Sequence, residues 1–208
     1  FHGLAPRFLG GVLEIPVYHM RGGTSTGILL YEEHLPKDLA LREELIRHIM
    51  GVPMEGEVAA NSQITGLGRG IPQSCKVFIV ARSARDDADI DSTLAQLAPG
   101  KAAIDWSVNC GNMSAALPVF AAKVGLVSLQ PGTSKVRIYN TNTGVVTHAL
   151  LETPEAGQPM ASDTVIPGVM GHWPGVQLAL LNPVGAKTGK LFPTGNLTDT
   201  FDGIEVSI

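Results

Sequence analysis

The segment from Asn112 to about Val124 is apolar on nearly every side, and it constrains the fold more than any other stretch of the chain. A helix with apolar residues all round is buried on all sides. Short runs rich in Val and Ile surround this segment in the sequence, so we expect a strongly curved sheet wrapped around one central helix. Pro118 lies inside the segment and should kink the helix or shorten its first part.

Short alternating or apolar runs predict the strands of this sheet. Their ranges are 13–20, 28–31, 76–81, 102–106, 136–139, 145–152, 176–181 and 203–208. A second helix is expected over 38–50, ended by Gly51, because its apolar residues recur on one face. That face contains Leu41, Leu45, Ile46 and Ile49. The segments 82–91 and 154–174 are expected to be connections, so the fold class is α+β.

Composition narrows the classes of function. Apolar residues make up 44% of the chain and charged residues 16%, which is typical of a globular protein. The formal net charge of −4 offers no basic stripe to neutralise phosphates, so we expect no nucleic-acid partner. No apolar run is long enough to span a bilayer, so we expect no membrane partner. Cys75 and Cys110 are the only cysteines, which favours the reducing cytoplasm over a disulfide scaffold.

The polar turn Asn109-Cys110-Gly111-Asn112 presents a cysteine where the apolar helix is expected to begin. Unpaired backbone N–H groups and the positive end of the helix dipole favour thiolate over thiol at such a position. The N–H groups of Gly111 and Asn112 can also hold a carboxylate or an enolate oxygen. The motif therefore predicts an acid/base group beside an anion cradle. Two structural alternatives stay open, a buried cysteine that packs as a small hydrophobe and a plain helix cap at Asn112.

Three further segments carry candidate site residues. Lys76 opens an apolar strand, and its side chain either extends to solvent or points into a site. The turn Gly22-Gly23-Thr24-Ser25 offers backbone and hydroxyl donors to a carboxylate, although an ordinary hairpin turn has the same composition. Arg21 can pair with a substrate carboxylate or, equally, with a nearby acidic side chain. Thr194 and Asn196 either approach a substrate or form a plain turn.

Other motifs predict no cofactor site. The six histidines show no spacing typical of metal ligands, so no metal is expected. The run Gly66-Leu67-Gly68-Arg69-Gly70 follows no clear strand and opens no helix, so it is not a dinucleotide-binding fingerprint. We interpret this run as flexible backbone near a site.

Six motifs, taken together and in order, resemble the PrpF family, which includes aconitate isomerase, methylitaconate isomerase and 4-oxalomesaconate tautomerase. They are Met20-Arg21-Gly22-Gly23-Thr24-Ser25, Gly66-Leu67-Gly68, Ser74-Cys75-Lys76-Val77, Asp105-Trp106-Ser107, Asn109-Cys110-Gly111-Asn112 and Pro193-Thr194-Gly195-Asn196. The resemblance covers nearly all of the 208 residues. An ordered set of this kind is far more specific than any single motif.

The resemblance implies the diaminopimelate-epimerase-like fold, in which two similar lobes each wrap a mostly antiparallel sheet around a central helix. The active site lies between the lobes. Residues 1–190 would then form the first lobe, and residues 191–208 the inter-lobe connection and the opening strand of a second lobe largely absent from this chain. Two positions depart from the pattern, since many members have lysine at the position of Thr26 and serine at that of Cys75.

The resemblance also implies the chemistry, an allylic proton shift on a small unsaturated di- or tricarboxylic acid such as aconitate. Lys76 and Cys110 map onto the family's catalytic lysine and cysteine. No metal or organic cofactor is needed, because the conjugation of the substrate delocalises the charge of the intermediate. The expected substrate-binding residues are Arg21, Gly22, Gly23, Thr24, Ser25, Asn109, Gly111, Asn112, Thr194 and Asn196.

Two other functions stay open. One is an epimerase or racemase with two thiols, which needs a second cysteine facing Cys110. Cys75 suits that role poorly, because it adjoins Lys76 and neighbouring strand residues point to opposite faces. The other is a truncated, non-catalytic lobe that serves as a binding module. For an enzyme, we expect the partner of this chain to be a second copy in a homodimer or the second lobe.

Overall fold

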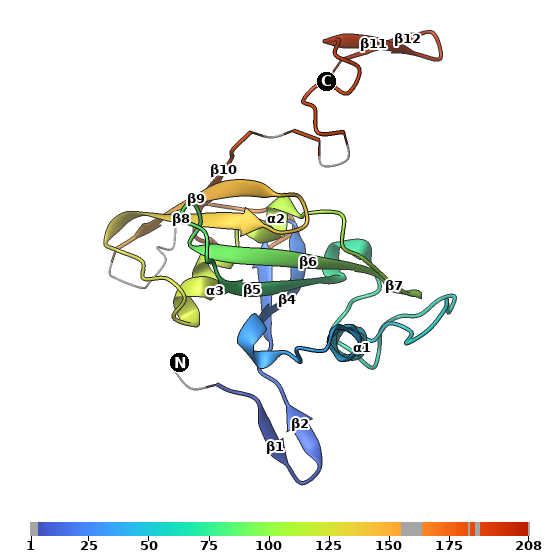
Figure 1. Ribbon diagram of the computed structural model, residues 1–208, viewed down its shortest axis with the longest axis vertical. Helices are drawn as coiled ribbons and strands as arrows, with labels where there is room; N and C mark the ends of the chain where they lie inside the picture. Colours follow the sequence, from blue (N-terminus) through green and yellow to red (C-terminus); the bar gives the residue numbers. More distant parts are fainter. Residues whose placement is uncertain (1–3, 155–163, 183, 186–187, 208) are drawn as a thin grey trace.

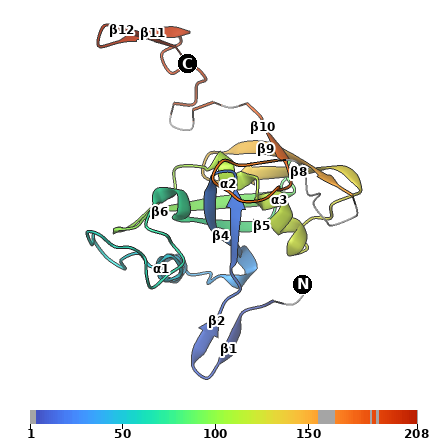
Figure 2. The same ribbon diagram turned by 180° about the vertical axis from the view of Figure 1, so that it is seen from behind.

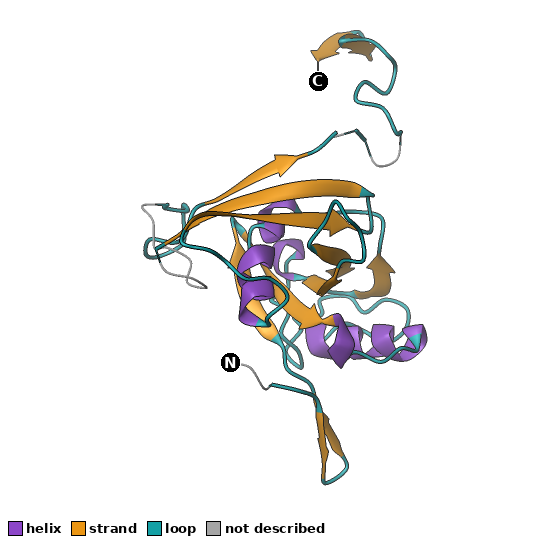
Figure 3. Ribbon diagram, turned by 60° about the vertical axis from the view of Figure 1, so that its left-hand side comes forward, coloured by secondary structure: helices purple, strands orange, loops and turns teal. Residues whose placement is uncertain are grey.

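The computed structural model describes residues 4–154, 164–182, 184–185 and 188–207. Its centre is one strongly curved sheet wrapped around two short helices (Figures 1 and 3). The strand order is β10-β9-β8-β6-β5-β4-β3, with β7 paired to β6 off this path. The strands are β3 (Tyr18–Gly22), β4 (Ser25–Tyr31), β5 (Lys76–Arg82), β6 (Ile90–Ala98), β7 (Lys101–Asp105), β8 (Gly132–Asn140), β9 (Val145–Thr153) and β10 (Val176–Leu180). Only the β4–β5 and β6–β8 pairs of this sheet are parallel, so the expected α+β fold with a mostly antiparallel sheet is confirmed.

The buried helix is split into α2 (Gly111–Ser114) and α3 (Leu117–Lys123). Pro118 lies in the first turn of α3, where a missing N–H breaks no helical hydrogen bond. The proline therefore shortens the first part of the expected helix instead of bending a continuous one. Met113, Leu117 and Phe120 are fully buried against the concave face of the sheet.

The opposite face of the sheet packs on α1 (Leu39–Met50). As a result β5 is buried on both faces, and its side chains alternate between two cores. Phe78 and Val80 join the core around α2 and α3, whereas Val77 and Ile79 join the core beside α1. The residues of β5 from Val77 to Ala81 are all apolar, as is typical of a central strand, which explains why the strand could be predicted from the sequence.

Caps fix both ends of α1, and the stop at Gly51 is the predicted one. Asp38 Oδ1 accepts a hydrogen bond from the Leu41 backbone N–H at 3.0 Å. Gly51 is left-handed, with φ of 68°, and its N–H donates to Arg47 O at 2.9 Å. The prediction that Leu41 belongs to the apolar face of this helix is wrong, because Leu41 is 55% exposed. The buried residues of this helix are Ile46 and Met50.

Two strand assignments differ from the expectation. No strand was predicted at β6, because its Ser, Thr and Ala residues hide its alternation. The connection expected over 82–91 is shorter in the structure, since β5 extends to Arg82 and β6 begins at Ile90. The expected strand over 13–20 is interrupted at Pro16, which cannot donate to a ladder. Its first part, β2 (Val12–Glu14), pairs with β1 (Arg7–Leu9) in a hairpin that stands away from the sheet (Figure 2). The C-terminal pair, β11 (Thr198–Phe201) and β12 (Ile204–Ser207), also stands away from it.

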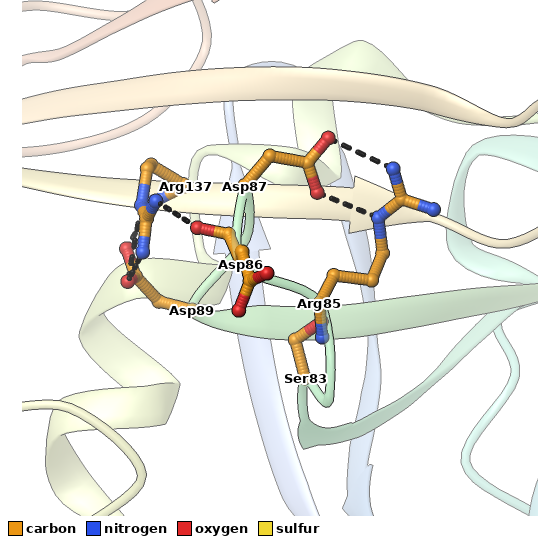
Figure 4. A network of polar contacts seen from close by, with 6 residues as sticks. All are labelled: Ser83, Arg85, Asp86, Asp87, Asp89 and Arg137. Atoms are coloured by element: carbon orange, nitrogen blue, oxygen red, sulfur yellow. Dashed lines mark hydrogen bonds and ion pairs between the residues drawn. The ribbon is translucent and has the colours of Figure 1, made fainter.

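The connection between β5 and β6 is held by two ion pairs (Figure 4). Arg85 forms a bidentate contact with Asp87, at 2.7 and 2.8 Å. Arg137 Nη2 lies 2.7 Å from Asp89 Oδ1, and the Arg137 backbone N–H donates to Asp89 Oδ2 at 2.7 Å. In each pair, the positive guanidinium compensates the negative carboxylate beside it. In the described ranges, no helix has the length and apolar character needed to cross a membrane.

Candidate active site

The turn between β3 and β4 packs directly on the start of α2. Gly22 and Ser25 are paired residues, so only two residues form the turn. A Cβ at Gly22 would clash with the Asn112 carbonyl oxygen and lie 2.7 Å from Met113 Cα, so only glycine fits. On the other side of the turn, Asn112 Nδ2 donates to Thr24 Oγ1 at 3.1 Å. The structure thus brings together two motifs that are about 85 residues apart in the sequence.

Cys110 occupies the N-cap position of α2, with an extended backbone (φ −122°, ψ 100°). Its carbonyl oxygen accepts hydrogen bonds from the Ser114 backbone N–H and hydroxyl, each at 3.0 Å. Asn109 Oδ1 accepts a hydrogen bond from the Cys110 N–H at 2.8 Å. The thiol donates to Ser25 Oγ, which lies 3.8 Å from Sγ. Cys110 is half-buried at the edge of the core, so it is not the sealed cysteine of the structural alternative.

The capping alternative for Asn112 is also wrong. The side chain of Asn112 binds Thr24 on the neighbouring hairpin, and Cys110 is the residue at the N-cap. Asn112 therefore joins the hairpin to the helix.

Lys76 begins β5 and is only 7% exposed, so its side chain does not extend along the surface. Its Nζ donates to Pro72 O at 2.6 Å. Pro72 belongs to a short 3-10 helix, η2 (Pro72–Ser74), that leads into the strand. Because side chains alternate along a strand, Lys76 lies on the same face as Phe78 and Val80, the face that packs on α2 and α3.

Lys76 and Cys110 therefore lie on the same face of the sheet, joined through β4. A Cβ at Gly27 would lie 2.8 Å from Lys76 O and 3.2 Å from Met113 Cε, so Gly27 lets the lysine strand approach α2. Ser25, two residues earlier on the same face of β4, contacts the Cys110 thiol. Lys76 Nζ is bound to Pro72 O in this arrangement.

Cys75 lies on the opposite face, as its position beside Lys76 predicts. It is fully buried in the core next to α1, and its Sγ is 2.9 Å from Gln63 Oε1. Burial raises the pKa of the Cys75 thiol. Thr26, the other departure from the family pattern, is 7% exposed and lies on the same face of β4 as Ile28, which belongs to that core. The two cysteines of this chain thus do not face one site, as a two-thiol epimerase requires.

A cavity of about 870 Å³ opens beside the contact between the hairpin and α2. Five predicted site residues line it, Arg21, Gly22, Gly23, Gly111 and Asn112. Its apolar wall comes from α3, β10 and the segment before β10. That wall contains Ala115, Ala116, Val119, Ile166, Val169, Trp173, Pro174, Val176 and Leu178. The cavity therefore meets the proposed anion cradle, whereas Lys76 and Cys110 are not among its lining residues.

Sequence reasoning missed His19, which also lines this cavity. Burial lowers the pKa of His19, and the charges of Arg69 and Arg21 lower it further. The available signal was the spacing of His19 and Arg21, which are two residues apart on β3 and so share a face. The contact between Lys76 and Pro72 O could not be predicted from residue types, because the Pro72 atom that accepts the hydrogen bond belongs to the backbone.

The glycines of 66–70 provide close packing, which corrects the expectation of flexible backbone. A Cβ at Gly66 would clash with the backbone of Gly51 at the end of α1. The Leu67 N–H donates to Ile49 O at 2.7 Å, and the Gly70 N–H donates to Gln63 Oε1 at 2.8 Å. The loop is therefore fixed to the helix.

Thr194 and Asn196 do not join the other site residues. Both bind Asp199, with Thr194 Oγ1 at 2.7 Å from Oδ2 and Asn196 Nδ2 at 3.2 Å from Oδ1. They belong to the C-terminal segment that stands away from the sheet (Figures 1 and 3). Across the described parts of the chain, no group of three His, Cys, Asp or Glu side chains is placed to hold a metal ion.

Comparison with known proteins identifies the family. A model of the PrpF protein family matches residues 12–208. Over 197 residues the chain is 36% identical to a 4-oxalomesaconate tautomerase of Pseudomonas putida, covering 95% of this chain and 53% of that protein. Over 200 residues it is 37% identical to a 3-methylitaconate isomerase of Eubacterium barkeri, covering 94% of this chain and 51% of that protein.

A solved structure agrees with these matches. The crystal structure of a methylitaconate-delta-isomerase superposes with a TM-score of 0.79 and 37% identity, covering 93% of this chain and 49% of the other. The chain spans about half the length of the curated relatives it matches. The family model, the relatives and the shared fold agree, and the chain belongs to the PrpF protein family.

Proposed function

We propose that the protein is a cofactor-independent isomerase that shifts a double bond in a small unsaturated di- or tricarboxylic acid. The observation that carries this proposal is the shared sheet face of Lys76 and Cys110, which Ser25 and Gly27 of β4 connect. The names of the relatives support the substrate class, because oxalomesaconate and methylitaconate are both acids of this kind.

The reaction moves one proton and one double bond. A base takes a proton from a carbon next to the conjugated system, and the electrons of the broken C–H bond enter that system as a delocalised, enolate-like anion. An acid then supplies a proton two carbons away, and the double bond forms at its new position. Cys110 and Lys76 are the proposed pair of groups. Lys76 Nζ has two N–H donors beyond the one bound to Pro72 O, so it can also stabilise the anion.

The proposed cradle for a substrate carboxylate lies where the hairpin meets α2. Gly22, Gly23, Thr24 and Ser25 supply one side, and Asn109, Gly111 and Asn112 the other. Fixed donors of this kind stabilise charge that develops during reaction, because they need no reorganisation. Arg21 lines the adjoining cavity and would bind a second carboxylate.

The wall facing the cradle would come from a second lobe, for which residues 191–208 form the connection and opening strand, or from a second copy of the chain. The support for this is that the relatives are about twice as long as the matched region. Thr194 and Asn196 would reach substrate only if that assembly moves them from their present bonds to Asp199. Two free cysteines suit a reducing cytoplasm, where we place the enzyme.

The test is proton NMR in D₂O on the full-length protein, with 4-oxalomesaconate, 3-methylitaconate and aconitate as candidate substrates. We expect deuterium to enter an allylic carbon of at least one acid, and we expect Cys110→Ser and Lys76→Ala each to slow this exchange by roughly 10²–10⁴-fold, the usual contribution of an acid/base group. The matched control is Cys75→Ser, which changes the other thiol but lies on the opposite face and keeps a donor for Gln63. The control should exchange at the wild-type rate.

Three outcomes would contradict the proposal. Exchange at the wild-type rate in both Cys110→Ser and Lys76→Ala would show that these two side chains are not the catalytic pair. A loss in Cys75→Ser equal to that in Cys110→Ser, in a variant that is still folded, favours the two-thiol alternative. Binding of the acids without exchange in the wild-type protein favours the non-catalytic module.

A further inference from the structure

Gln96 of β6 lies opposite Lys76 and binds the backbone that leads into it. The two residues are partners in the antiparallel β5–β6 ladder, so their side chains lie on one face of the sheet. Gln96 Nε2 lies within donating distance of three carbonyl oxygens, at 3.2 Å from Pro72 O, 3.1 Å from Cys75 O and 2.9 Å from Leu97 O. Two of these acceptors belong to η2 and its C-cap residue, directly before Lys76. The Gln96 amide therefore ties the start of β5 to β6.

The carbonyl oxygen of Pro72 connects this tie to the Lys76 side chain. Besides the Gln96 amide, it accepts hydrogen bonds from Lys76 Nζ at 2.6 Å and from the Cys75 N–H at 3.3 Å. Both of these donors lie within four residues of Pro72 in the sequence. Gln96 is the donor that comes from another strand. Its amide therefore fixes, relative to the sheet, the oxygen to which Lys76 Nζ is bound.

The position of Lys76 Nζ depends on this bond. The ladder with β6 fixes the backbone of Lys76, but the four-carbon side chain is flexible and has many rotamers. Pro72 O occupies one of the three N–H donors of Nζ and leaves two for a reacting acid. A shift of Pro72 would move Nζ with it, and misplacement of a reacting group by about 1 Å lowers a rate by roughly 100-fold.

We propose that Gln96 is a positioning residue for the isomerisation, which fixes Pro72 O and through it sets where Lys76 Nζ meets the acid. Gln96 itself does not touch the acid. The inference rests on the proposed function, in which Lys76 is one of the two reacting groups. It adds a side chain of β6 to a site whose other members lie on β3, β4, β5 and the start of α2.

The first test replaces Gln96 with methionine, which keeps the length of the side chain and removes the amide. Initial rates of deuterium exchange on the full-length protein, over a range of concentrations of the acid that exchanges fastest, give the turnover number and KM. We expect Gln96→Met to lower the turnover number by roughly 10–100-fold and to change KM by less than about twofold, because the lost bonds hold the lysine and not the acid. The matched control, Gln177→Met, makes the same change at an exposed position of β10 and should leave both constants unchanged.

A second comparison shows whether the loss passes through Lys76. Lys76→Ala removes the side chain that Gln96 places, so adding Gln96→Met should slow the remaining exchange by less than about twofold. Equal losses in the wild-type and Lys76→Ala backgrounds would show that Gln96 acts on the sheet as a whole, and would overturn the proposal. So would a wild-type turnover number in Gln96→Met, or a raised KM with an unchanged turnover number, which would place Gln96 against the acid. If urea unfolding shows that Gln96→Met does not fold, the same comparisons use Gln96→Asn, whose amide is one methylene shorter.

A third measurement separates failure of this inference from failure of the isomerase, because it needs no turnover. The wild-type protein and Gln96→Met are treated with limiting acetic anhydride, and the acetylation of Lys76 is read by mass spectrometry relative to the exposed Lys37. We expect acetylation of Lys76 to be several times faster in Gln96→Met, because Nζ is released from Pro72 O. If acetylation is unchanged while the wild-type protein exchanges deuterium, the isomerase stands and the positioning role falls. If Gln96→Met releases Lys76 in a protein that exchanges no deuterium with any candidate acid, Gln96 still places Lys76 and the isomerase falls.

Discussion

Replacing Gly22 with alanine tests whether the contact between the hairpin and α2 positions the site. The added Cβ would lie 2.7 Å from Met113 Cα, whereas ordinary contact begins at 3.4 Å, so the two must separate by at least 0.7 Å. The opposing atoms belong to the backbone, so no side-chain rotation relieves the clash. We expect the free energy of unfolding to fall by about 1–3 kcal/mol, which is typical of overpacking. The displacement carries Cys110 with α2, and misplacement on this scale lowers a rate by roughly 10–100-fold.

Two assays separate the effects. Urea unfolding gives the change in stability, and initial rates of deuterium exchange, measured well below the melting temperature, give the change in turnover. Gly111→Ala is the matched control for stability, because a Cβ there meets nothing within 4 Å and this glycine adjoins Cys110. A Gly22→Ala protein that unfolds and exchanges like the wild type would refute the positioning role of this contact.

Three further predictions concern stability, each measured by urea unfolding. Asp38→Ala removes the N-cap of α1 and should lower the free energy of unfolding by about 1 kcal/mol, while an unchanged value would show that the cap bond is not formed. Phe120→Ala empties the core against Tyr18, at a ring distance of 5.1 Å, and should lower it by about 3–5 kcal/mol, whereas less than 1 kcal/mol would place Phe120 outside the core. Asp89→Asn should lower it by about 1 kcal/mol at pH 7. Burial raises the pKa of Asp89, but hydrogen bonds from Arg137 outweigh burial and lower it. The ion pair therefore stabilises the fold above about pH 4. This contribution is lost as the pH falls through the depressed pKa, so the free energies of unfolding of wild type and Asp89→Asn should converge near pH 2. A difference between them that grows on acidification would contradict the assignment.

The elements with strong local signals could be predicted from the sequence. The central helix was evident because its apolar character leaves it no exposed side, and α1 was evident because its apolar residues recur with helical spacing and Gly51 marks its end. The core strand β5 was evident because it is apolar from Val77 to Ala81. In each case the signal lies within a single element and does not depend on what packs against it.

The elements that depend on distant partners could not be predicted. The strand β6 mixes polar residues with Ile, Ala and Leu on both of its faces, so it shows no clean alternation, and its pairing with β8 joins residues 48 apart in the sequence. The exposure of Leu41 depends on how α1 sits on the sheet. The glycines of 66–70 became interpretable only when Gly66 was seen against Gly51, since the sequence alone does not distinguish close packing from flexibility.

For the site, the motifs singled out the hairpin turn and the start of α2, which the structure brings into contact, but not the contacts themselves. The sequence placed Cys110 at the start of a helix, and the structure adds Ser25 as the neighbour of its thiol. From the sequence, the side chain of Lys76 could either extend to solvent or point into a site. In the structure Lys76 is buried at the start of its strand, which excludes the solvent-exposed alternative.

The most direct test of the central claim, that Lys76 and Cys110 serve one reacting acid, is a double-mutant cycle on the turnover number. Groups that act as a unit give strongly non-additive losses when they are removed together. The account predicts that Cys110→Ser combined with Lys76→Ala is no slower than the slower of the two single variants. Losses that multiply in the double variant would show that the two side chains act independently, and would contradict the account.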